Sequence, residues 1–191
     1  MLKDLVIRNR SYRRFDESRR VTREQLESYV ETSRFCPASV NIQPLKYRLI
    51  SDPAECDALF PLTAWARMLP DFPGPPEGHR PTGYIVICSD SELAPNAARF
   101  AKDIGIVAQT MMLAAVEDGF GGCMIGNFSP EKVSELLRLD QRYVPCLILA
   151  LGTPDEEIIL EDAAPGESVK YYRDENDVHH VPKRTLDEIL L

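Results

Sequence analysis

The chain has 191 residues, of which 44% are hydrophobic and 27% charged, and it carries a formal net charge of −8. These values are typical of one globular domain with its own core, and the acidic balance argues against a nucleic-acid partner. No apolar run approaches the roughly 20 residues of a membrane span, and the charged start of the chain lacks the apolar segment of a signal peptide. We therefore expect a cytoplasmic protein with no membrane partner.

Short helices and turns are predicted for the first part of the chain. Asp4 to Asn9 is expected to form a short helix. Thr22 and Gln25 have the spacing of a capping box, in which each side chain bonds the backbone of the other residue, and this predicts the start of a second helix. That helix should run to about Arg34, because Pro37 disfavours helical geometry in the residue before it.

The next segment contains a turn, a strand, a helix start and a loop. Asn41 to Pro44 predicts the turn, and the alternation from Lys46 to Ser51 predicts a strand. Asp52-Pro53 indicates another short helix, with Asp as its cap and Pro at its first position. The proline-rich stretch from Leu69 to Pro81 predicts a loop, which we interpret as a lid over a site or an excursion over the surface.

A long apolar helix from Ala97 to Asp118 is the stretch around which the chain is expected to be organised. Its apolar residues recur at helical spacing: Ile104, Val107, Ala108, Met111, Met112 and Ala115. Small residues occupy its other faces, so the helix should pass through a core or lie against a second subunit. The glycine-rich run Gly119–Gly126 follows it. These glycines allow positive φ and leave backbone amides without side-chain cover beside the core.

The second half of the chain adds two buried strands and a polar tail. Continuous apolar runs predict strands at Tyr84–Cys88 and Pro145–Leu151, the second closed by Gly152-Thr153-Pro154. A helix capped by Ser129 should extend to Leu139. The acidic tail from Glu156 to Val181 has little periodicity and should travel over the body or over a partner subunit. The whole chain is thus predicted to be a single three-layer α+β domain, residues 1–191, with its sheet seated on the central helix.

The cysteines and histidines do not suggest a metal site. The five cysteines are scattered and form no CxxC pair: Cys36, Cys56, Cys88, Cys123 and Cys146. Of these, Cys88 and Cys146 lie in apolar strand-like runs and are expected to be buried thiols. His179 and His180 are adjacent but have no cysteine or acidic residue at ligand spacing, so we expect no bound metal.

Common nucleotide and hydrolase motifs are missing, but four separated segments suit one ligand. The glycine run lacks the third glycine of GxGxxG, and neither GxxxxGK[ST] nor GxSxG occurs. Basic groups inside an acidic protein favour a small anionic ligand. A flat, phosphorylated cofactor could bind to all four segments. Arg10 and Arg13 offer guanidinium groups and Ser11 offers a hydroxyl. The other three segments are the turn Pro37-Ala38-Ser39-Val40-Asn41, the backbone of Met124-Ile125-Gly126 and the basic pair Lys183-Arg184.

In this order, the segments resemble the FMN-dependent nitroreductase family over nearly the whole chain. Arg10-Ser11-Tyr12-Arg13-Arg14-Phe15 is similar to the family's R-S-x-R-x-F, and Pro37 to Pro44 is similar to its P-S-x-x-N-x-Q-P-W turn. The central helix with Gly119–Gly126 resembles the family's helix and flavin-edge loop. Leu149–Pro154 resembles its closing strand, and Pro182-Lys183-Arg184 its phosphate-binding end. The chain departs from the pattern at Leu45, where the family has Trp, and at Asn9, where it has a basic residue.

The resemblance implies an α+β fold with a mostly antiparallel sheet packed on a central helix, in a homodimer that exchanges its tails and binds FMN at two interface sites. It implies ping-pong transfer from NAD(P)H through FMN to a nitroaromatic, a quinone or a related acceptor. Arg10 and Arg184, with Lys183 beside them, would hold the phosphate, and Arg13 would lie near the pyrimidine edge. Ser39 and Asn41 would bond ribityl or ring heteroatoms, a backbone amide within Met124–Gly126 would serve N5, and no side chain would act as a catalytic acid or base.

Other interpretations of the same residues stay open. The arginines near the N-terminus could form a solvated face paired with Asp16 and Glu17. Ser39 and Asn41 could serve only turn chemistry, and the glycines could be a simple helix cap. The alternative functions are a flavin-binding protein that carries, senses or degrades FMN without reducing an acceptor, and a cofactor-free dimeric interaction protein of the same fold.

Overall fold

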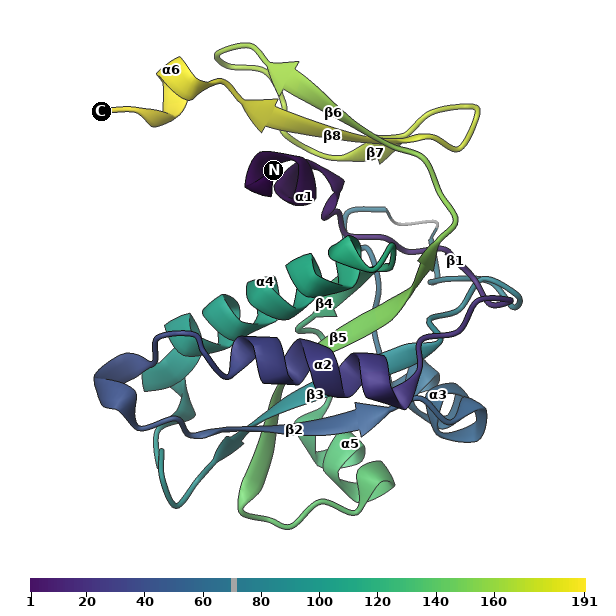
Figure 1. The fold of residues 1–191 in the computed structure, drawn as a ribbon. Coiled ribbons are helices and arrows are strands. Elements are labelled where there is room, and N and C mark those ends of the chain that lie inside the picture. Colours follow the sequence, from purple (N-terminus) through teal and green to yellow (C-terminus); the bar gives the residue numbers. More distant parts are fainter. Residues whose placement is uncertain (70–71) are drawn as a thin grey trace.

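The computed structural model describes residues 1–69 and 72–191, and its centre is a five-stranded antiparallel sheet (Figure 1). The path runs from β2 (Leu45–Ile50) through β3 (Gly83–Asp90) to β5 (Tyr143–Pro154). Both β4 (Gly121–Ile125) and the two-residue β1 (Phe15–Asp16) pair with β5. All eight residues of β3 are buried, as its continuous apolar sequence predicts for a strand covered on both faces.

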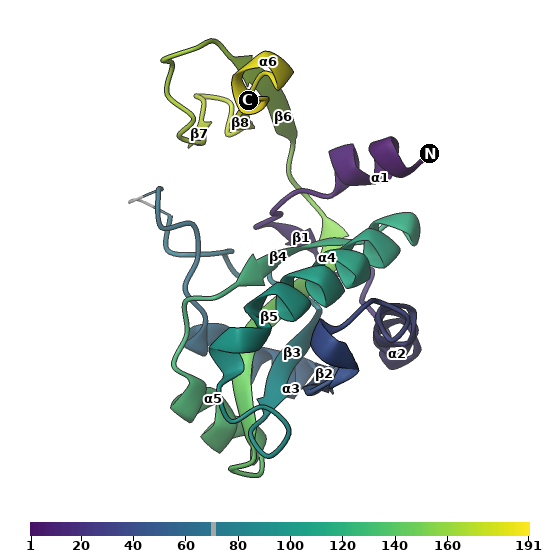
Figure 2. The ribbon, with the colours of Figure 1, turned by 90° about the vertical axis from the view of Figure 1, so that its left-hand side faces the viewer.

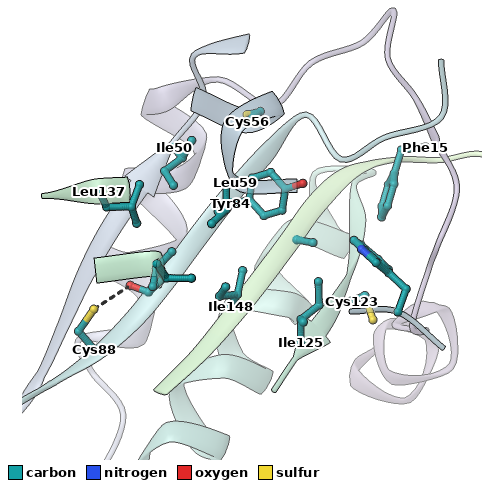
Figure 3. Close-up of a cluster of buried hydrophobic side chains, with 14 residues drawn as sticks. Phe15, Ile50, Cys56, Leu59, Tyr84, Cys88, Cys123, Ile125, Leu137 and Ile148 are labelled. Carbon is teal, nitrogen blue, oxygen red and sulfur yellow. Dashed lines mark hydrogen bonds between the residues drawn. The ribbon is translucent and has the colours of Figure 1, made fainter. Parts of the chain in front are cut away.

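Helices cover both faces of this sheet, which confirms the predicted three-layer α+β fold (Figures 1 and 2). On one face, α2 (Arg23–Ser33) and α4 (Ala101–Glu117) pack on Ile85 and Ile87 of β3. On the other face, α3 (Pro53–Leu59) and α5 (Pro130–Leu137) pack on Tyr84, Val86 and Cys88 of the same strand. Figure 3 shows this second cluster, in which Ile148 and Ile125 lie beside Cys123. The alternation along β3 therefore divides the core into two parts.

Local capping chemistry fixes the starts of three helices where the sequence predicts them. Thr22 Oγ1 accepts from the Gln25 N–H at 3.2 Å, while Gln25 Oε1 accepts from the Thr22 N–H at 2.9 Å. Asp52 and Ser129 accept from the third residue of α3 and α5 in the same way. The expected end of α5 at Leu139 was too late. The helix ends at Leu137 because Arg138 is left-handed, with φ 51°.

The N-terminal helix and the proline-rich loop differ little from expectation. The first helix, α1, spans Leu2–Arg8 and so begins two residues earlier than predicted. It packs against α4. The described part of the proline-rich loop, residues 72–81, contains no helix or strand. The remainder of that predicted loop includes residues 70 and 71, which lie outside the described residues. Among the described residues, no helix has the length and apolar character needed to cross a bilayer.

The glycines after α4 have a different role from the one predicted. Only Gly119 adopts positive φ, at 77°, and the next glycines belong to the strand β4 rather than to a loop. A Cβ on Gly121 would lie 2.5 Å from Tyr12 Cδ2, and a Cβ on Gly122 would lie 2.2 Å from the Ala150 carbonyl oxygen. Glycine is therefore required for close approach of neighbouring chain segments and not for unusual backbone angles.

The prediction for the end of β5 was wrong, and the polar tail forms a sheet that its sequence does not predict. Gly152-Thr153-Pro154 continues β5 instead of closing it, because Thr153 and Pro154 pair with β1. The tail folds into a second sheet, in which β6 (Ile158–Ala163) and β8 (His179–Arg184) are parallel and β7 (Tyr172–Arg173) pairs with β8. A short helix, α6 (Leu186–Ile189), follows. We call residues 158–191 the arm; it stands apart from the three-layer body (Figures 1 and 2).

The expectation of two buried thiols holds for Cys88 but not for Cys146. Cys88 is buried, and this burial raises its pKa to about 12. Cys146 is half-buried. The pairing of β3 with β5 moves from Ile87–Leu147 to Cys88–Pro145. Cys146 is thus the extra residue of a β-bulge, which turns its side chain away from the regular alternation.

Candidate active site around Arg13

The start of the segment Arg10–Phe15 meets β4 at Gly122, two residues before the predicted ligand-binding segment Met124–Gly126. Ser11 and Gly122 form a parallel bridge, and the Tyr12 N–H donates to the Gly122 carbonyl at 2.9 Å. The missing side chains of Gly121 and Gly122 allow this contact. Further along β4, Met124 is exposed and Ile125 is buried in the core, so Ile125 can offer a ligand only its backbone.

Arg13 is a buried cation whose guanidinium contacts neutral groups. Its side chain is 8% exposed. Nη1 donates to the Ser11 carbonyl at 3.1 Å and lies 3.3 Å from His179 Nε2, and the guanidinium carbon lies 5.1 Å from the centre of the Tyr171 ring. Within the described ranges, no carboxylate forms an ion pair with it, and its Nε has no hydrogen-bond partner. A solvated face is therefore the wrong interpretation for this arginine.

Two carboxylates beside this cluster, both among the described residues, are bonded to other arginines. Glu156, in the connection from β5 to the arm, accepts from the Arg13 backbone N–H and forms an ion pair with Arg173. Asp177 forms ion pairs with Arg14 and Arg173. These bonds attach the arm to the N-terminal segment. The negative charges are matched by Arg14 and Arg173, and the side-chain charge of Arg13 is left without a bonded anion.

The turn predicted at Pro37–Asn41 is fixed by the start of α4. Asp103, in the first turn of that helix, accepts from the Ser39 N–H at 2.9 Å and from Ser39 Oγ at 2.6 Å. The one hydroxyl proton of Ser39 is thus used within the chain, and the oxygen keeps its capacity to accept. Asn41 is exposed, and its Oδ1 accepts from Gln43. Pro37 and Ala38 line a pocket of about 290 Å³ beside this turn.

The basic residues predicted to bind phosphate make separate contacts in one chain. Arg10 donates to the Val6 carbonyl of α1 at 2.7 Å. Arg184 forms an ion pair with Glu188 of α6, and its neighbour Lys183 is exposed at the end of β8. A single chain therefore holds Arg10, Arg13 and Arg184 in three different local settings.

Comparison with known proteins identifies the family. Residues 7–71 and 79–153 match the model of the nitroreductase family. The chain belongs to the nitroreductase family. This confirms the family that the sequence motifs indicate, and the match includes Arg10–Arg13, Pro37–Asn41 and Met124–Gly126.

Individual members of the nitroreductase family resemble the chain over most of its length. It is 29% identical over 202 residues to the oxygen-insensitive NADPH nitroreductase of Salmonella typhimurium, covering 98% of this chain and 77% of that protein. The crystal structure of a nitroreductase family protein from Streptococcus pneumoniae has a TM-score of 0.71 at 18% identity and covers 100% of this chain and 99% of that one. The structure of an FMN-dependent nitroreductase from Clostridium difficile has a TM-score of 0.63 at 22% identity and covers 80% of this chain and 87% of that one.

Two residues of the arm that lie beside Arg13 are not indicated by the motifs. Tyr171 and His179 pack against Arg13, but they lie in a polar segment without a recognisable period. The fold also brings two acidic residues to His180 that its sequence neighbours do not suggest. His180 Nδ1 lies 2.5 Å from Glu161 and its Nε2 lies 3.3 Å from Asp174, and these bonds raise the pKa of His180. Glu161 belongs to β6, and Asp174 follows β7 in the turn that leads to β8, so the fold of the arm brings both to His180. Among the described residues, no group of three potential ligands forms a metal site.

Proposed function

We propose that this protein is an FMN-dependent oxidoreductase that takes electrons from NAD(P)H and passes them to a nitroaromatic, a quinone or a related small acceptor by a ping-pong scheme. Family membership supports this proposal. So do the names of two relatives, one an NADPH nitroreductase and the other an FMN-dependent nitroreductase. The observation that carries it is the buried guanidinium of Arg13. Leaving a buried charge without a partner costs roughly 3–5 kcal/mol, which a bound anionic group would offset.

The residues around Arg13 fit FMN, because its ring gains negative charge on reduction. The guanidinium is held by a carbonyl, an imidazole and an aromatic face, and these neutral groups leave its positive charge unmatched. When bound, FMN accepts a hydride from the nicotinamide and passes electrons to the acceptor. Arg13 would stabilise the negative charge that reduction adds at the pyrimidine edge. Arg10 and Arg184, with Lys183, would bind the phosphate, and the backbone of Met124–Gly126 would face the ring.

The position of Ser39 supports a homodimer in which each FMN site contains residues from both copies. Ser39 is bonded to the first turn of α4, whereas Ser11 and Arg13 lie beside β4, which follows the other end of that helix. The 17 residues of α4 extend about 25 Å. A ring in contact with Arg13 could therefore meet the Ser39–Asn41 turn of a second copy more readily than that of its own chain.

The colour of the purified protein and its response to nicotinamide cofactors test the proposed function. We expect bound flavin absorbance and rapid bleaching by NADH or NADPH under anaerobic conditions, with the colour restored by a quinone or a nitroaromatic. A protein that binds FMN but stays yellow with both nucleotides would be a non-reducing flavoprotein. A colourless protein that takes up no added FMN would contradict both flavin functions.

The exposed apolar face of α4 leads to a prediction about the dimer. We expect Ile106→Glu to weaken dimerisation about a hundredfold, because a carboxylate would be buried against the second copy without a partner. Val144→Glu, at the start of β5, is the matched control, since Val144 and Ile106 are both 39% exposed. Sedimentation equilibrium measures the dissociation constant of each variant. A monomeric wild-type protein, or equal constants for the two variants, would contradict the proposed dimer.

A further inference from the structure

The arm contributes a buried histidine to the surroundings of Arg13. His179 is the first residue of β8, is 2% exposed, and its backbone N–H donates to the Glu157 carbonyl at 2.9 Å. Its ring packs on Tyr171, with 5.3 Å between the ring centres. The Tyr171 hydroxyl in turn accepts from the Met68 N–H at 3.2 Å. These contacts fix the imidazole between the arm and the body.

We propose that His179 is a positioning residue, which accepts a hydrogen bond from Arg13 and so holds the guanidinium in place for FMN. The proposal rests on the proposed function. Nη1 of Arg13 has two acceptors, the Ser11 carbonyl from its own segment and His179 Nε2 from the arm. The Ser11 bond alone leaves the guanidinium free to turn about its long side chain. The second bond, from a different element, fixes its orientation.

Hydrogen-bond chemistry determines the form of the imidazole. A guanidinium is only a donor, so His179 Nε2 must carry the lone pair and Nδ1 the proton. If the ring were protonated, its Nε2–H would face the N–H of Arg13, and its positive charge would face that of the guanidinium. The buried Nδ1 has no partner among the described side chains and backbone groups. Burial, followed by the charge of Arg13, lowers the pKa of His179 to about 4, which agrees with a neutral ring at physiological pH.

The other charged groups around His179 favour the same state. Arg173 of β7 adds a second positive charge, and His180, the next residue of β8, also opposes protonation. Asp177 acts in the opposite direction, but its carboxylate is bonded to Arg14 and Arg173. Glu156 is likewise bonded to Arg173. Positive charge therefore prevails around the ring, and His179 remains a neutral acceptor.

Three substitutions at His179 separate positioning from general support of the fold. His179→Gln places an amide oxygen near the position of Nε2 and can still accept from Arg13. His179→Asn is shorter and cannot reach, and His179→Leu has no acceptor. We expect the Asn and Leu variants to show two-electron reduction of FMN that is about tenfold less favourable, equivalent to about 30 mV. Bleaching by NADPH should slow about tenfold, and His179→Gln should restore both properties.

The test combines the FMN midpoint potential with nuclear magnetic resonance of the His179 ring in flavin-free protein. The ring should show the Nδ1–H tautomer between pH 5 and pH 8, and Arg13→Met should raise its pKa toward the ordinary value. Equal potentials in wild type, Gln and Asn variants, or an Nε2–H tautomer in the wild type, would overturn the proposal. A wild-type protein that never takes up flavin removes the proposed function and the role toward FMN. In that case the tautomer of the flavin-free protein would still show whether His179 accepts a hydrogen bond from Arg13.

Discussion

Gly122→Ala is expected to separate β4 from β5 and to lower the free energy of unfolding by about 3 kcal/mol or more. The added Cβ would lie 2.2 Å from the Ala150 carbonyl oxygen and 2.9 Å from Leu151 Cδ2. The carbonyl belongs to the central strand β5 and cannot rotate away, so the strands themselves must move apart. The Tyr12 bond to the Gly122 carbonyl would be weakened at the same time.

Gly126→Ala is the matched control for this stability measurement. It adds the same methyl group just after β4, where no atom lies within 4 Å of the new Cβ and φ is not positive. We expect a change below about 1 kcal/mol. Chemical denaturation of flavin-free protein measures both variants, so that loss of ligand binding does not affect the comparison. A Gly122→Ala protein with the wild-type midpoint would show that β4 can be displaced at little cost.

Helix starts and the buried strand could be predicted because the interactions that fix them are local. The capping bonds of Thr22, Asp52 and Ser129 each join residues three positions apart. The apolar sequence of β3 directly reflects a strand covered on both faces. The glycine run was misread for the opposite reason. Gly121 and Gly122 are constrained by Tyr12, Ala150 and Pro154, and no local pattern identifies contacts with residues so distant in the sequence.

The arm shows a second limit of the sequence. Its longest pairing joins β6 to β8 in parallel, from Ile158–His179 to Ala163–Arg184. The large apolar residues of these strands are Ile158, Ile159 and Leu160 at the start of β6 and Val181 in β8. Ion pairs such as those of His180 and Arg173 hold the arm together and join it to the body. A polar strand stabilised in this way has no apolar alternation. The motifs therefore indicate the family, but they do not indicate that residues of the arm surround Arg13.

Arg13→Ala is expected to slow the bleaching of bound FMN by NADPH at least a hundredfold while most of the flavin stays bound. Removal of one preorganised group that stabilises developing charge in a dry site costs about 10²–10³ in rate. Arg13 is 8% exposed and forms no ion pair with any described carboxylate, so its charge is little screened. Arg13→Lys keeps the charge but loses the planar fork, and we expect an intermediate rate. Anaerobic stopped-flow absorbance measures these rates.

Arg184→Ala should have the opposite effect, with about tenfold to a hundredfold weaker FMN binding and a nearly unchanged bleaching rate at saturating flavin. Arg184 lies at the end of β8, is exposed and pairs with Glu188 four residues later. A charge-assisted bond from such a residue to a phosphate stabilises the bound state without reaching the ring. Arg23→Ala is the control, because it breaks another exposed pair of the same spacing, with Glu27. Parallel loss of FMN in the Arg13 and Arg184 variants would mean that both arginines hold the cofactor and neither tunes it.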